Sequence, residues 1–223
     1  MAFDFEPSII LETAPQLLGG MKLTLIITLG GLLVGLLLGV VTGLANTSRS
    51  RFLRGIAILY IEAIRGTPLI VQVMFLYFGL PLALGMRIPP DVAGVIAIGV
   101  NSGAYIAEIV RGAIQSIDKG QTEAGRALGL SKSQTMIYIV IPQAIKNVLP
   151  PIGNEFIVLI KETAIVGYVS MTDLTRAANQ VVSITYQAFM PLIGAAVIYF
   201  VIIKILTILL AKLERRLRQG DNR

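Results

Sequence analysis

Apolar residues gather in five long runs along this chain, and polar residues gather between the runs. The runs cover about residues 23–45, 52–81, 91–114, 137–169 and 187–212. A helix needs about twenty mostly apolar residues to cross the hydrocarbon core of a bilayer, so the pattern predicts five membrane-spanning helices. The fourth run contains Pro142, Pro150, Pro151 and Gly153. These residues predict that its helix is broken within the span.

The first run carries a glycine at every fourth position, Gly31, Gly35, Gly39 and Gly43. Residues four apart lie on one face of a helix, and small residues let a second helix come close. The stripe therefore predicts tight packing inside a helix bundle rather than a direct part in transport.

Composition agrees with one integral membrane domain over residues 1–223. Hydrophobic residues make up 55% of the chain and charged residues only 14%, whereas soluble domains have about 25% charged residues. Acidic residues precede the first cation, Lys22, so no cleaved signal peptide is expected. The chain has no cysteine and no histidine. We therefore expect no disulfide, no metal site, no catalytic residue and no cofactor.

The positive charges predict the orientation. One set of loops and ends carries Arg49, Arg51, Arg54, Arg111, Lys119, Arg126, Lys132, Lys146, Lys212, Arg215, Arg216, Arg218 and Arg223, and the opposite set carries Lys22, Arg87 and Arg176. Cytoplasmic loops are enriched in Lys and Arg, so the first set is assigned to the cytoplasm. The N-terminus is then outside and the C-terminus inside. This rule also accounts for the net charge of +6 without a nucleic-acid partner.

The polar loop of residues 115–136 predicts a compact elbow. Good helix formers surround Glu123 and Ala124, and Gly129 suits a left-handed helix cap. Ser131 and Gln134 then have the spacing of a capping box at the start of another helix. Small residues at Ala124 and Gly125 would let a partner approach closely. A polar elbow between spans is typical of a docking surface for a protein in water.

The motif in this loop resembles the EAA loop of ABC-importer permeases. Glu123-Ala124-Gly125 is followed by Gly129 and then by Ile139-Val-Ile-Pro142. Glycine replaces the alanine at the third place of the family's Glu-Ala-Ala, and Ile141 replaces a leucine. Three further stretches resemble the permeases that import polar amino acids such as histidine, arginine or glutamine. They are residues 62–69 (EAIRGTPL), residues 101–112 (NSGAYIAEIVRG), and IPQA at 141–144 with Leu149-Pro150. The resemblance spans about residues 18–217.

This resemblance implies an all-α permease in a bacterial cytoplasmic (inner) membrane, which imports an amino acid by alternating access. Its implied partners are two ATP-binding-cassette ATPase subunits, a second permease subunit (identical or a paralogue) and an extracytoplasmic solute-binding protein. It also makes residues Glu123, Ala124, Gly125, Gly129, Ile139 and Pro142 the contacts that couple the permease to the ATPase. The sequence has no Gly-x-x-x-x-Gly-Lys-Ser/Thr run, so ATP hydrolysis is expected in a separate subunit and this chain is not an enzyme.

Ionisable and polar residues inside the spans are candidates for the pathway, because such residues are costly in lipid. Glu62 with Arg65, and Glu108 with Arg111, are spaced to pair along one helix face; internal pairing is the favoured interpretation. Asn101 lies near the middle of the third span, with Tyr105 four residues on. A helix–helix hydrogen bond and a ligand contact are equally open for Asn101.

The remaining candidates are Glu155, Lys161, Glu162 and Thr163. They lie in or after the proline-containing segment, where a broken helix would free backbone groups for a charged ligand. If the two Glu–Arg pairs neutralise one another, the net charge of these residues is minus one, which favours a cationic amino acid. Asp173 and Arg176 could form a gate, although a solvated turn is favoured. A secondary transporter or a channel-type subunit remains the alternative, but neither requires a docking elbow.

Overall fold

The structure, a computed structural model, describes residues 8–219, and the regular secondary structure there is all helical, with no strand. The long helices are α1 (Ser8–Asn46), α5 (Pro90–Gln115), α8 (Ile141–Glu162) and α10 (Phe189–Gln219). Between α1 and α5 lie α2 (Arg51–Arg65), α3 (Leu69–Met74), the π-helical η1 (Phe75–Gly79) and α4 (Leu80–Leu84). After α5 come α6 (Lys119–Ala127), α7 (Lys132–Thr135), the π-helical η2 (Met136–Val140), the 3₁₀-helical η3 (Thr163–Val169) and α9 (Leu174–Thr185).

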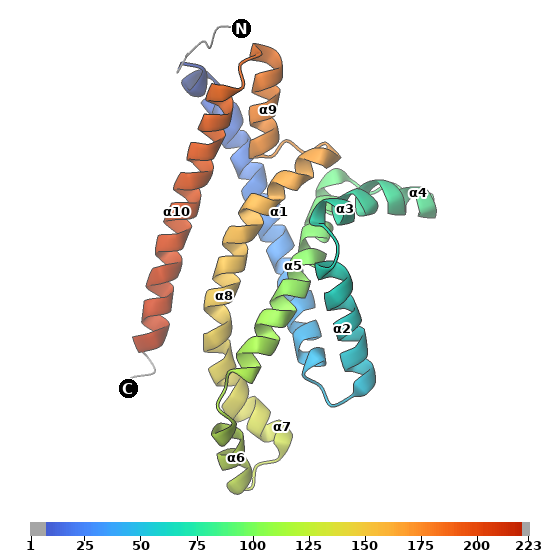
Figure 1. The fold of residues 1–223 in the computed structure, drawn as a ribbon, viewed down its shortest axis with the longest axis vertical. Coiled ribbons are helices and arrows are strands. Elements are labelled where there is room, and N and C mark those ends of the chain that lie inside the picture. Colours follow the sequence, from blue (N-terminus) through green and yellow to red (C-terminus); the bar gives the residue numbers. More distant parts are fainter. Residues whose placement is uncertain (1–7, 220–223) are drawn as a thin grey trace.

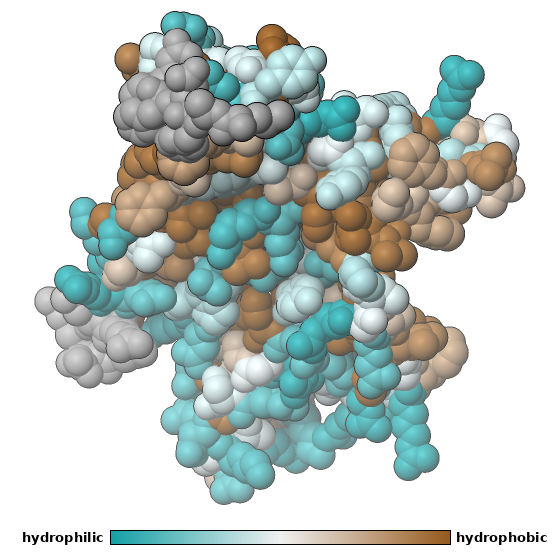
Figure 2. Space-filling model, turned by 45° about the horizontal axis from the view of Figure 1, so that its top comes forward, coloured by the Kyte–Doolittle hydropathy of each residue, from teal (hydrophilic) through white to brown (hydrophobic). Residues whose placement is uncertain are grey.

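The long helices run side by side, and the short ones gather at the two ends of the bundle (Figure 1). The start of α1 and α9 lie at one end, and α6 and α7 project from the other. The turn between α1 and α2 and the end of α10 point toward the α6–α7 end. Hydrophilic residues cover that end, while hydrophobic residues gather over the middle of the molecule (Figure 2).

The glycine stripe of α1 packs against α5. Gly31, Gly35, Gly39 and Gly43 are all buried. A Cβ atom on Gly39 would lie 2.6 Å from the Cβ of Ile106 and 2.8 Å from the carbonyl oxygen of Gly103. The two helices therefore touch nearly backbone to backbone, which confirms the prediction of close packing inside the bundle.

Three helices, α1, α5 and α10, are long and apolar enough to cross a membrane, and a bent pair could make a fourth span. That pair lies in the run predicted as one span over residues 52–81. There α2 and the helical segment Leu69–Leu84 meet at 101°, so this run is two helices joined by a sharp bend rather than one continuous helix. Gly66, Thr67 and Pro68 form the bend, because the residue before a proline avoids the helical conformation.

The fourth run differs from the prediction in the opposite way. Helix α8 continues from Ile141 to Glu162 through Pro150 and Pro151, so the break predicted at these prolines was wrong. Helix type changes only at its ends, to π-helix before Ile141 and to 3₁₀-helix after Glu162. The polar stretch after this run is not a plain loop either, because it contains α9.

Candidate functional site: the elbow and the polar centre of the bundle

The elbow predicted from the sequence is present in detail. Gly129 has φ +85°, and the backbone N–H of Leu130 donates to the carbonyl of Gly125 while that of Gly129 donates to Arg126. This is the Schellman arrangement that ends a helix with a left-handed glycine. Two residues on, Ser131 and Gln134 make both hydrogen bonds of a capping box. Both predicted caps are confirmed.

The residues assigned to coupling divide into an outward and an inward group. Glu123 and Ala124 are exposed on α6, and Pro142 is exposed at the start of α8. Gly125 is instead buried, and a Cβ atom there would lie 2.7 Å from Cδ1 of Ile139 and 2.9 Å from Cγ2 of Thr135. Gly125 thus lets α6 pack on η2 of the same chain, and the expectation that a partner approaches it was wrong. The coupling residues left exposed for a partner are Glu123, Ala124, Gly129 and Pro142.

Asn101 makes a contact between helices. Its side-chain Nδ2 donates to Oε1 of Gln72 at 3.0 Å, and Asn101 is buried. Gln72 in turn donates from Nε2 to the carbonyl of Ile64 at 2.8 Å and to that of Thr67 at 3.1 Å. These are carbonyls that the bend leaves without helical partners. The helix–helix interpretation of Asn101 is the one that the geometry favours, and the contact fixes the bend to α5.

Glu155 lies beside this contact on the next helix. Its Oε1 accepts a hydrogen bond of 3.1 Å from Ser102, the residue after Asn101, and both side chains are buried. Asn101 and Ser102 therefore join α5 to α3 on one side and to α8 on the other. Together Gln72, Asn101, Ser102 and Glu155 form a continuous polar strip across the bundle, which we call the polar strip.

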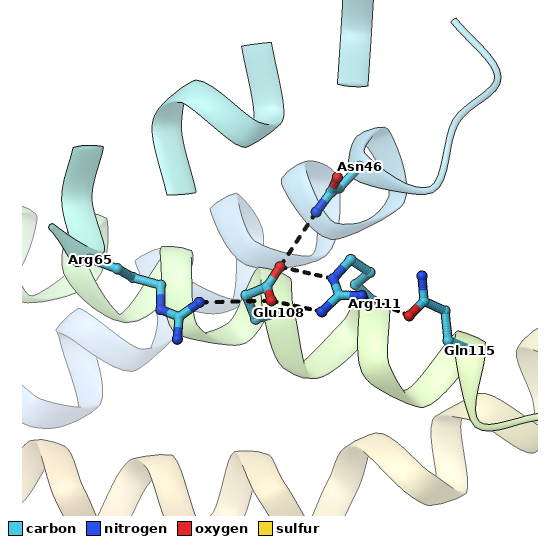
Figure 3. A network of polar contacts seen from close by, with 5 residues as sticks. All are labelled: Asn46, Arg65, Glu108, Arg111 and Gln115. Atoms are coloured by element: carbon cyan, nitrogen blue, oxygen red, sulfur yellow. Dashed lines mark hydrogen bonds and ion pairs between the residues drawn. The ribbon is translucent and has the colours of Figure 1, made fainter. Parts of the chain in front are cut away.

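Tyr105 lies apart from this strip. It is 38% exposed, and its ring lies 5.3 Å from the guanidinium carbon of Arg65. Arg65 also approaches Glu108, with 3.7 Å between Nη1 and Oε2. Arg111 donates to the same carboxylate at 2.9 and 2.8 Å, and Asn46 donates to it at 3.4 Å (Figure 3). The Glu108–Arg111 pair is confirmed.

The prediction of a Glu62–Arg65 ion pair was wrong, because the side chain of Arg65 turns toward α5. Glu62 is exposed and makes no ion pair with any residue in the described range 8–219. The spacing along α2 allowed the pair, but the packing of α2 on α5 offers Arg65 a carboxylate that Arg111 already orders.

The side chains of Lys161, Glu162 and Thr163, at the end of α8, lie in different surroundings. Lys161 is exposed and Glu162 is partly buried. Thr163 is buried, where its hydroxyl lies 2.8 Å from that of Thr28 and donates to the carbonyl of Leu159 at 2.7 Å. Its contacts therefore hold the end of α8 on α1. Of the substrate candidates, Asn101 and Glu155 belong to the polar strip, and Glu162 lies close enough for its charge to act on Glu155.

Two functional residues were missed or misread from the sequence. Gln72 was not singled out, although a glutamine four residues after Pro68 in an apolar run was a usable signal. Asp173 was expected in a solvated turn but is fully buried. It caps α9 by accepting from the N–H groups of Thr175 and Arg176 at 2.9 and 3.2 Å. Arg176 is partly buried and donates to the carbonyl of Gly167.

Known proteins match this chain over nearly its whole length. The family model of the "Binding-protein-dependent transport system inner membrane component" matches residues 31–219. The glutamine transport system permease protein GlnP of Escherichia coli (strain K12) is 43% identical over 215 residues, 96% of this chain and 98% of that protein. The arginine transport system permease protein ArtQ of Bacillus subtilis (strain 168) is 42% identical over 221 residues, 99% of this chain and 100% of that protein.

Solved structures give the same result. A crystal structure of an amino acid ABC transporter with histidines contains a chain of 44% identity and a TM-score of 0.91, covering 97% of this chain and 100% of that one. The MetNI methionine ABC transporter in an inward-facing conformation shares the fold at 21% identity, with a TM-score of 0.77 and coverage of 91% and 96%. The resemblance seen in the sequence is confirmed, and the chain belongs to the family of inner membrane components of binding-protein-dependent transport systems.

Proposed function

We propose that this chain is the translocation subunit of an ATP-driven importer of amino acids and works by alternating access. The observation that carries the proposal is the end-to-end match, at a TM-score of 0.91 and 44% identity, to a chain of an amino acid ABC transporter. Relatives named for glutamine and arginine transport match over at least 96% of this chain. The proposal treats residues 1–223 as one permease domain.

We assign five spans, with α8 as the fourth, an outer N-terminus and a cytoplasmic C-terminus. Helix α8 carries Lys146, Glu155, Lys161 and Glu162, which makes it less apolar than the other long helices. It nevertheless packs between α5 and α10 in the bundle. A polar helix in a membrane is tolerated where protein rather than lipid covers its polar face.

The elbow is proposed to receive the ATPase. Glu123 and Ala124 present an exposed face at the hydrophilic end of the molecule (Figure 2). The two caps at Gly129 and Ser131 make the elbow a stiff unit, so a push on α6 would pass through Gly125 and Ile139 into η2 and α8. Two ATPase subunits, a second permease subunit and a binding protein at the α9 end complete the proposed importer.

Charge reversal tests the elbow. Glu123→Lys should abolish ATPase capture and ATP-dependent uptake in proteoliposomes, because it reverses the charge of the docking face without disturbing a buried contact. Glu12→Lys, an equally exposed reversal at the opposite end of the molecule, serves as the matched control for ATPase capture, which it should retain. ATPase capture and uptake that survive Glu123→Lys would refute the docking assignment. Uptake that needs no ATP would refute the importer itself and favour a secondary transporter.

The substrate is proposed to be a polar amino acid that meets the polar strip. Glu155 is a buried carboxylate whose one described hydrogen bond comes from a hydroxyl, and such a group favours a ligand with an additional positive charge. The charge balance derived from sequence no longer supports this preference, because Glu62 and Arg65 do not pair and Lys161 is exposed. The preference for a cationic amino acid therefore depends on Glu155 alone.

Uptake measurements with arginine, lysine, histidine, glutamine and glutamate test this preference. Glu155→Gln should reduce uptake of the cationic substrates tenfold or more relative to glutamine, whereas Glu62→Gln, at an exposed position of α2, should not change the ranking. A wild-type preference for glutamine that Glu155→Gln leaves intact would overturn the cationic assignment while leaving the importer proposal standing.

A further inference from the structure

A cavity of about 610 Å³ lies at the α6–α7 end of the molecule, outside the polar strip. One wall is the turn between α1 and α2, with Thr47 and Arg49, and the other is the elbow, with Arg126 and Lys132. The cavity thus connects two segments that are about eighty residues apart in the sequence, and any ligand in it would contact both.

The charge of the cavity is entirely positive. Arg49, Arg126 and Lys132 line it, and none of its lining residues is acidic. Arg126 is held in place because its Nη1 donates to the carbonyl of Leu130 at 2.8 Å. Arg49 and Lys132 make no ion pair with any residue between 8 and 219. Three cations without an acid favour an anionic ligand, and the hydroxyls of Thr122 and Ser133 add polar groups.

Part of the cavity lining is apolar. It is formed by Met136, Ile137 and Val140 of η2, the segment that leads from the elbow into α8. Ile137 is 55% exposed. An anion with a hydrocarbon part fits a site whose lining combines cations with aliphatic side chains. A free phosphate or an acidic side chain would leave this apolar part of the lining uncovered.

We propose that this cavity binds an anionic phospholipid of the cytoplasmic leaflet. Its phosphate lies among Arg49, Arg126 and Lys132, and its acyl chains lie along η2. Basic pockets between membrane helices on the cytoplasmic side suit such headgroups. The choice of leaflet rests on the orientation proposed above. A bound lipid would brace the elbow against the α1–α2 turn, so the lipid composition of the membrane would set how firmly ATPase motion reaches the bundle.

Native mass spectrometry of the purified complex, ATPase included, tests the proposal by titration with phosphatidylglycerol. Phosphatidylcholine with the same acyl chains and free glycerol 3-phosphate are the comparison ligands. We expect phosphatidylglycerol to bind at least tenfold more tightly than either of them. The Arg49→Gln/Lys132→Gln variant should weaken its binding about 30-fold, the factor for about 2 kcal/mol at about 1 kcal/mol per basic residue.

The matched control is Arg51→Gln/Arg54→Gln, which removes the same charge from exposed positions of α2 that do not line the cavity. It should retain the wild-type affinity. Equal weakening in both double variants would overturn the site, as would binding of glycerol 3-phosphate as tight as that of the lipid. Phosphatidylglycerol binding that appears only after the ATPase is removed would show that the ATPase fills the cavity and would also overturn the proposal. Lipid binding is measured without transport, so its failure is distinct from failure of the importer.

Discussion

The single carboxylate of Glu108 interacts with two arginines. Arg111 donates two hydrogen bonds to it, Arg65 approaches from α2, and Asn46 reaches it from the end of α1 (Figure 3). Without the acid, two guanidinium groups would lie in apolar segments with no described counter-charge, which is costly. Glu108 therefore holds the ends of three helices together.

Neutralising this acid should destabilise the permease. We expect Glu108→Gln to lower the thermal unfolding midpoint of the purified complex by several degrees, at about 2–4 °C per kcal/mol for a domain of this size. Glu62→Gln is the matched control, because Glu62 is exposed and has no ion pair among the described residues. Equal midpoints for the two variants would show that the Glu108 network adds no stability.

Asp173 caps α9 from a fully buried position. Burial raises the pKa of its carboxyl above the ordinary value, although the N–H groups of Thr175 and Arg176 act in the opposite direction. A carboxyl whose pKa is raised on folding contributes stability that is fully present below the unfolded pKa of about 3.9 and is lost as the pH rises through the folded pKa. At neutral pH its charge therefore costs stability while its hydrogen bonds add to it.

Two substitutions separate these effects. Asparagine caps a helix about as well as aspartate but carries no charge, so Asp173→Asn should match or exceed the wild-type melting temperature at pH 7. Its advantage should shrink as the pH falls toward the folded pKa, because the wild-type carboxyl becomes protonated. Asp173→Ala loses the cap and should cost about 1 kcal/mol. An Asn variant as unstable as the Ala variant at pH 7 would contradict this account.

At the scale of elements, the contact between α1 and α5 is limited by backbone approach. Gly39→Ala should destabilise the bundle by about 1–3 kcal/mol, because its Cβ would meet the carbonyl oxygen of Gly103 at 2.8 Å. Gly55→Ala is the control: no atom lies within 4 Å of a Cβ at this exposed helical position, so a gain of up to about 1 kcal/mol is expected. The thermal unfolding midpoints of both variants, measured in the same detergent, test this prediction. A Gly39→Ala protein as stable as Gly55→Ala would mean that α1 and α5 can move apart without loss of stability.

Elements whose ends depend on neighbouring residues could be predicted from the sequence. The elbow is such an element, since Gly129 and the Ser131–Gln134 box act within six residues and do not depend on the rest of the fold. The glycine stripe likewise indicated close packing, although its partner, α5, could not be read from a period of four.

Elements whose geometry depends on distant partners could not be predicted. The same residue type, proline, ends α2 at Pro68 but stays within α8 at Pro150 and Pro151. At the bend, Gln72 supplies hydrogen bonds to the freed carbonyls of Ile64 and Thr67, and Asn101 anchors Gln72 from α5. The polar strip and the Arg65–Glu108 contact arise only once this bend has placed α2 and α3 on α5. Helix spacing alone therefore predicted the wrong acidic partner for Arg65.

At the scale of the whole molecule, hydropathy and charge give different answers on whether α8 crosses the membrane. Three helices, or four with the bent pair, are apolar enough to cross a membrane, and α8 is not among them. The cations nevertheless gather in the segments at the α6–α7 end of the bundle, including Arg49, Lys132 and Arg215. Positive charges mark the cytoplasmic side. If α8 crosses, the elbow and α9 lie on opposite sides of the membrane.

Cysteine labelling decides whether α8 crosses, and the natural absence of cysteine makes single substitutions unambiguous. We expect Ile184→Cys in α9, at a side chain that is 74% exposed, to react with a membrane-impermeant maleimide in intact cells. Ser133→Cys in the elbow should react only after the membrane is opened. Met86→Cys, between α4 and α5 and 49% exposed, should behave like Ile184→Cys, because five spans place both outside. If Ser133→Cys and Ile184→Cys react from the same side, α8 does not cross and the five-span assignment is wrong. If Met86→Cys is protected while Ile184→Cys reacts, the bent pair does not cross, and the chain turns back at Pro68 instead.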